Sequence, residues 1–245
     1  MLKNTETKME EMSAPPSEKT RSVSGVHRYA VAYLLGALAL MFISMPLLEQ
    51  IGHGEGIAVA ILTVVLLFAV LAVGNSHRTL MWAFLLVMPA VAARWIYHLR
   101  PDIMPISVSL VFGLLFVVFI ISHLFSFILR APHVDSEVLC AALAGYLMLA
   151  LVWGFAYVLV AELVPDSFIF IAGPASGHAM KGFTALYFSF VTLCTVGYGD
   201  IVPVSGMARA LAMMEAGAGV FYVATLISRL VALYSSKGDP DGKPP

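Results

Sequence analysis

Charge and cysteine are what this chain has least of. Only 12% of its 245 residues are charged, and the formal net charge is -1. A net charge so close to zero argues against a large basic surface, and we expect no nucleic-acid partner. The two cysteines, Cys140 and Cys194, are too few for the disulfide framework of a small secreted protein.

Apolar residues fill the chain instead. They make up 60% of the sequence, and the mean hydropathy is +0.90, more than a soluble domain of this length can bury. Six runs reach the roughly 17 to 25 residues that a helix needs to cross a hydrocarbon core of about 30 Å. The sequence therefore predicts an all-α membrane protein with six transmembrane helices, near 29–48, 56–74, 79–98, 104–129, 137–163 and 207–233.

The polar segments define domains and orientation. Residues 1–28 hold almost no aromatic side chains and predict a disordered tail, and residues 234–245 form a second short tail. Between them we expect a four-helix domain over 29–130, a linker over 131–136 and a second domain over 137–233. With the N-terminus inside, ten of the 14 lysines and arginines fall on the cytoplasmic side. We expect a multi-pass protein of the inner cell membrane with both termini cytoplasmic.

The interval between the fifth and sixth runs is unusual. After a polar, Gly- and Pro-rich loop, the segment FTALYFSFVTLC at 183–194 is apolar again, but 12 residues are too few to span a membrane. Such a segment is typical of a re-entrant helix. The irregular backbone after it is tolerated at membrane depth only where protein or water covers its polar groups.

The next residues, TVGYGD, carry the chemistry. Gly197 and Gly199 permit backbone angles that are closed to other residues, so successive carbonyls can turn toward one side. One chain supplies one wall of oxygens. Four copies around an axis would form stacked rings able to replace the hydration shell of a cation. The short helix would direct its partly negative carboxyl end at the same path.

This motif resembles the selectivity filter of the tetrameric potassium channels. The resemblance covers roughly residues 137–233, with an outer helix, a pore helix that ends in SFVTLCTVGYGD, Pro203 and a glycine-containing inner helix. It implies a homotetramer embedded in membrane lipids that conducts potassium passively. No catalysis and no cofactor other than the permeant ion is expected. The resemblance implies that dehydrated potassium is coordinated by the Thr195 hydroxyl and by the carbonyls of Thr195, Val196, Gly197 and Tyr198.

The residues expected to support the filter depart from the commonest family pattern. Tyr187-Phe188 stands where that pattern has two tryptophans, so an indole donor for Asp200 is missing and the Tyr187 hydroxyl is the available substitute. Cys194 stands where many relatives have threonine, a stronger hydrogen-bonding group. The expected supports are Tyr187, Thr192, Cys194, Gly199 and Asp200.

The sixth run holds three candidates for a gate or hinge. Gly217 and Gly219 fit either a bend in the helix or close helix packing, and both interpretations remain open. Glu215 is the only acidic residue in this run and lies about 12 Å into the helix at 1.5 Å per residue.

Glu215 allows two interpretations. In the first it packs behind the filter and hydrogen-bonds Ser189, Thr192 or Tyr187, because an unpaired buried carboxylate is costly. In the second it faces the water-filled cavity, where four carboxylates would concentrate cations.

The fourth run, 104–129, contains no arginine. A voltage sensor needs several, each worth about 2.3 kcal/mol per 100 mV if it crosses the whole field. The sequence therefore predicts conduction that is insensitive to voltage.

The sequence also bears on three other functions. GYGD also fits the GxGD signature of intramembrane aspartyl proteases, which need a second aspartate within the membrane. A secondary transporter would show paired repeats, and 182–200 has no second copy. A weakly selective cation channel stays open as an alternative. The remaining aspartates all lie in expected loops or the tail: Asp102, Asp135, Asp166, Asp239 and Asp241.

Overall fold

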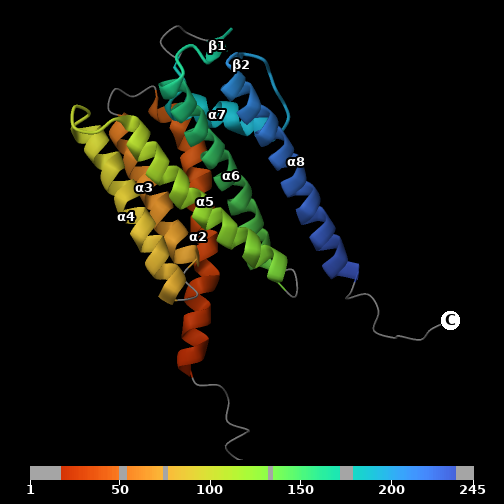
Figure 1. The fold of residues 1–245 in the computed structure, drawn as a ribbon. Coiled ribbons are helices and arrows are strands. Elements are labelled where there is room, and N and C mark those ends of the chain that lie inside the picture. Colours follow the sequence, from red (N-terminus) through yellow and green to blue (C-terminus); the bar gives the residue numbers. More distant parts are fainter. Residues whose placement is uncertain (1–17, 50–53, 74–76, 132–134, 172–178, 236–245) are drawn as a thin grey trace, which may run out of the picture.

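The structure, a computed structural model, describes residues 18–49, 54–73, 77–131, 135–171 and 179–235. Six of the helices in these ranges are long and apolar enough to cross a membrane, which confirms the predicted all-α membrane protein. In chain order (Figure 1) the elements are α2 (Glu18–Leu48), α3 (Gly54–Val73), α4 (His77–Leu99), α5 (Ile106–Arg130), α6 (Ser136–Leu163), β1 (Phe168–Phe170), α7 (Gly182–Leu193), β2 (Ile201–Pro203) and α8 (Gly206–Ser235).

The N-terminal end of α2 corrects one boundary. We expected a disordered tail over 1–28, but α2 begins at Glu18. Residues 18–28 contain no proline, and a helix already formed by the apolar residues downstream extends at the gain of one hydrogen bond per residue. The rest of the two expected tails, 1–17 and 236–245, lies outside the described residues.

One hydrophobic core joins the first four helices to α6. Leu34 and Leu38 of α2, Ile120 of α5 and Met148 of α6 are buried in the same cluster. In Figure 1, α6 lies between the bundle of α2 to α5 and α8. The four-helix domain is therefore packed on α6 of its own chain, and the two expected domains share one interior.

A second cluster fixes α7 and β1. The Tyr157 ring of α6 lies edge-on to Phe188 of α7 and Phe168 of β1, at centroid distances of 4.8 Å and 5.8 Å. Phe168 and Phe188 lie 5.6 Å apart. Edge-to-face packing of three rings sets the position of α7 against α6.

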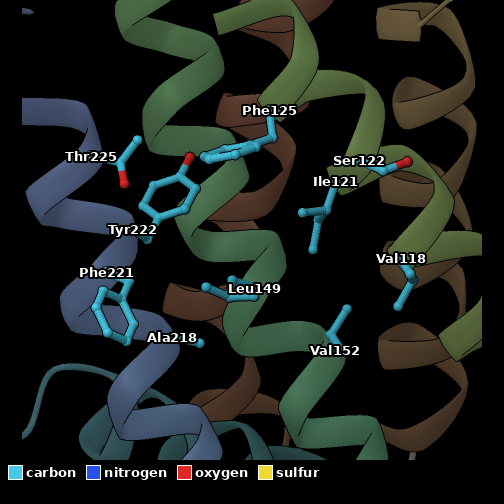
Figure 2. Close-up of a pocket in the computed structure, with 10 residues that line it drawn as sticks. All are labelled: Val118, Ile121, Ser122, Phe125, Leu149, Val152, Ala218, Phe221, Tyr222 and Thr225. Atoms are coloured by element: carbon cyan, nitrogen blue, oxygen red, sulfur yellow. The ribbon is translucent and has the colours of Figure 1, made fainter. Parts of the chain in front are cut away.

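Helix α8 leaves much of its apolar surface uncovered within one chain. Met213 and Phe221 are each 74% exposed, and Ile227 is 56% exposed. Beside this face, α5, α6 and α8 line a groove of about 400 Å³ (Figure 2). Tyr222, one of the lining residues, donates a hydrogen bond to the carbonyl of Ala142 at 2.8 Å. Such an apolar face needs a partner or lipid to cover it.

Candidate functional site

The short helix α7 is held between α6 and α8. Gly154 of α6 lies against the backbone of α7, and a Cβ there would be in ordinary van der Waals contact, 3.6 Å from Leu186 Cα. At the other side, a Cβ on Gly219 of α8 would lie 2.2 Å from the carbonyl oxygen of Leu193. The carboxyl end of α7 is therefore in contact with the backbone of α8.

The loop after α7 has an alternating backbone. Thr195 and Gly197 have φ of +57°, Gly199 has φ of +78°, and the residues between them, Val196 and Tyr198, do not have positive φ. Apart from glycines, the described residues with positive φ are Asp166 and Thr195. Alternation between the left-handed region and the usual regions lets successive carbonyls point the same way, instead of to opposite sides as in a strand.

The end of α7 anchors this loop. The amides of Thr195 and Val196 donate to the carbonyls of Thr192 and Val191, each at 2.9 Å. These bonds satisfy carbonyls that a helix end leaves free, and they place the loop on the negative end of the helix dipole. Val196 and Tyr198 are 52% and 71% exposed in the single chain, whereas Leu193 is buried. One side of the loop is therefore open.

The outer end of the loop is held at Asp200. The Tyr187 hydroxyl donates to Asp200 Oδ2 at 2.8 Å, which is the substitution proposed for the missing indole. The amide of Ile171 donates to the carbonyl of Asp200 at 2.8 Å, next to the antiparallel pair of β1 and β2, in which Ile169 lies opposite Val202. Sequence reasoning missed this two-stranded sheet, although the run SFIFI at 167–171 has a composition typical of strands.

The inner end of the loop is held by α6. The Tyr146 hydroxyl lies 3.4 Å from the carbonyl oxygen of Leu193, to which it donates, and 3.5 Å from Cys194 Sγ. Cys194, a weak hydrogen-bonding group, therefore has the Tyr146 hydroxyl as its partner. Thr192 takes part through its backbone carbonyl.

Glu215 is fully buried within the chain, so the interpretation in which it faces the cavity is wrong. Its Oε1 lies 2.5 Å from Ser189 Oγ, one of the three expected partners, and Tyr157 donates to Oε2. Sequence reasoning missed Tyr157, because nothing local shows that a residue 58 positions earlier faces this point.

The two inner-helix glycines differ. A Cβ at Gly219 would collide with the carbonyl of Leu193, whereas a Cβ at Gly217 would meet nothing within 4 Å. Helix α8 runs through both positions from Gly206 to Ser235. Close packing therefore explains Gly219, and α8 is an uninterrupted helix at both glycines.

Six of the described helices are apolar and long enough to cross a membrane, and a short helix lies between the last two of them. An anchored loop that is open on one side follows the short helix, which is the order of elements predicted from the sequence. Residues 145–236 match the family model described as "Ion channel". This part of the chain is therefore similar to an ion-channel domain.

Curated relatives of the chain are named as potassium channels. Two-pore potassium channel 1 of Arabidopsis thaliana is 44% identical over 63 residues, which are 25% of this chain and 17% of that protein. The calcium-gated potassium channel TvoK of Thermoplasma volcanium is 44% identical over 50 residues, 20% of this chain and 14% of that protein. Two pore potassium channel b of Oryza sativa subsp. japonica is 49% identical over 49 residues, 20% of this chain and 14% of that protein. The chain thus spans a small part of each relative's length. No solved structure matches it significantly.

Proposed function

We propose that this protein is a potassium-selective channel that conducts passively through a filter of backbone carbonyls from Thr195, Val196, Gly197 and Tyr198. The alternation of positive φ at positions 195, 197 and 199, at the carboxyl end of α7, carries the proposal. The potassium channels among the relatives support the choice of ion. Potassium is the permeant ligand, and the proposal needs no cofactor.

The proposal requires four chains around the path, because one chain supplies only one wall of oxygens. The exposed apolar face of α8, with Met213 and Phe221, and the open side of the loop at Tyr198 are the surfaces that neighbouring copies would cover. The excess of cytoplasmic lysine and arginine supports an inner-membrane orientation with both termini inside.

Flux from liposomes tests the function. Purified protein in liposomes should release potassium much faster than sodium, and protein-free liposomes should release neither. Comparable rates for both ions would favour the weakly selective cation channel. A flux of potassium that requires counter-transport of another solute would favour a transporter.

Opening is expected to be nearly independent of voltage. Within α5 the only arginine is Arg130, the last residue of the helix, so no ladder of charges crosses the field. Single-channel recording across negative and positive potentials measures this. A steep sigmoidal rise of open probability with voltage would contradict it.

Tyr187→Phe is expected to weaken the outer end of the filter. The substitution removes the donor that lies 2.8 Å from Asp200, and a hydrogen bond to a charged group contributes about 1.5 to 3 kcal/mol. Potassium flux should decay faster with time, at unchanged initial selectivity. The control is Tyr33→Phe, because Tyr33 is 60% exposed on α2. Equal decay in Tyr187→Phe and wild type would show that the bond does not support the filter.

A further inference from the structure

Three helices meet at the carboxyl group of Glu215. Tyr157 from α6 donates to Oε2, Ser189 from α7 lies 2.5 Å from Oε1, and Glu215 itself belongs to α8. The group is fully buried, and the described contacts do not bring it to the filter loop. The protonation state of this carboxyl group therefore decides which hydrogen bonds hold α7 to α6 and α8.

The number of protons available to the hydrogen bonds around Glu215 indicates its protonation state. Ser189 Oγ lies 2.5 Å from Glu215 Oε1 and also 2.7 Å from the carbonyl oxygen of Ala150. A serine hydroxyl carries one proton, and a carbonyl oxygen can only accept. If Glu215 were a carboxylate, the three contacts would share only the protons of Ser189 and Tyr157. One close pair of oxygens would then have no proton between them.

A neutral carboxylic acid satisfies all three contacts. Oε1–H donates to Ser189, Ser189 donates to Ala150, and Tyr157 donates to Oε2, so each oxygen pair has one proton. A complete network of this kind is strongly favoured in a buried site over one with an unsatisfied member.

The ionisable groups around Glu215 also favour the neutral acid. The titratable groups that face Glu215 from α6 are Tyr157 and Tyr146. Helix α7 contributes Tyr187, whose hydroxyl is bonded at the outer end of the loop, and β2 (Ile201–Pro203) carries no titratable side chain. On α8 itself Arg209 is exposed and lies nearly two turns away. Among the described residues no cation faces the carboxyl group, and a buried carboxylate without a counter-charge is costly.

We propose that Glu215 is held as the neutral acid, the first donor in a hydrogen-bond chain from α8 through α7 to α6, and that loss of its proton weakens the support of the filter. Glu215 is thus a positioning residue that acts through Ser189. The part of the inference that concerns conduction rests on the proposed function.

Raising the pH removes the proton and leaves Oε1 and the Ala150 carbonyl competing for the Ser189 proton. Thermal stability and potassium flux of the wild type should therefore fall as the pH rises. Glu215→Gln should remove this dependence, because its amide donates to Ser189 while its oxygen accepts from Tyr157 at every pH.

Infrared difference spectroscopy of the full chain in lipid tests the protonation state without any measurement of conduction. At neutral pH the band of a protonated carboxyl group should disappear in Glu215→Gln. It should persist in the control Glu162→Gln, because Glu162 is exposed at the end of α6. Loss of a carboxylate band in Glu215→Gln would overturn the proposal.

A second variant covers the case in which Glu215→Gln does not fold. Ser189→Ala removes the acceptor of the acid, so the protonated carboxyl band should shift in frequency and remain. An unchanged acid region in Ser189→Ala would overturn the proposal.

Melting temperature and flux across pH complete the test. A decline in the wild type that is absent in Glu215→Gln supports the proposal, and the same decline in both overturns it. If no variant conducts potassium at any pH while the infrared band and the pH-dependent melting are as expected, the proposed function fails and the protonation state of Glu215 stands.

Discussion

Replacement of Gly197 or Gly199 by alanine is expected to abolish selective potassium flux. These glycines have φ of +57° and +78°, and an L-residue in the left-handed region costs roughly 1 to 2 kcal/mol. In the proposed assembly of four chains the cost would be about 4 to 8 kcal/mol. An alanine backbone that relaxes to negative φ would turn a carbonyl away from the ion path.

Liposome flux of potassium and sodium measures this effect. The matched control is Gly36→Ala, because Gly36 lies inside α2 without positive φ and has nothing within 4 Å of an added Cβ. Gly36→Ala should keep wild-type flux. Wild-type selectivity in both Gly197→Ala and Gly199→Ala would show that the alternating backbone is not the source of selectivity.

Gly219→Ala is expected to have the second large effect, on folding and conduction together. The new Cβ would lie 2.2 Å from the carbonyl oxygen of Leu193, a backbone atom that cannot move without moving the end of α7. Overpacking of this kind costs about 1 to 3 kcal/mol, and here it also displaces the residue that precedes the filter loop by two positions. The melting temperature and the potassium flux should both fall.

Gly217→Ala is the control two residues earlier on the same helix. An added Cβ at Gly217 meets nothing within 4 Å of the chain, and alanine favours a helix over glycine by about 1 kcal/mol. This variant should fold as well as the wild type. If Gly217→Ala abolishes flux while Gly219→Ala does not, Gly217 is the hinge and the packing argument for Gly219 fails.

The first four helices, α2 to α5, share one hydrophobic core with α6. Because buried residues of α2 and α5 pack in the same cluster as those of α6, a change in the packing of α2 or α5 is transmitted to α6. The only arginine in α5 is Arg130, its last residue, so these helices pack against α6 without a ladder of charges along α5.

The sequence by itself determined the features that depend on local composition. Six apolar runs predict six helices because length and hydropathy alone decide whether a helix can cross a membrane. The shortness of 183–194 predicts a helix that does not span, and the structure has α7 there. The glycines of TVGYGD permit the positive φ that the structure has at Gly197 and Gly199.

Tertiary structure alone decided which distant residues meet. Tyr157 and Glu215 are 58 positions apart, Ser189 stands between them in sequence, and only the packing of α6, α7 and α8 brings the three together. The sequence alone does not distinguish the roles of Gly217 and Gly219, whereas in the structure only Gly219 lies against Leu193. The pairing of β1 with β2 likewise depends on where the filter loop emerges. The physical reason is common to all three. The composition of an apolar helix indicates that it lies in a membrane, but shape complementarity and the need to satisfy buried polar groups determine which helices it packs against.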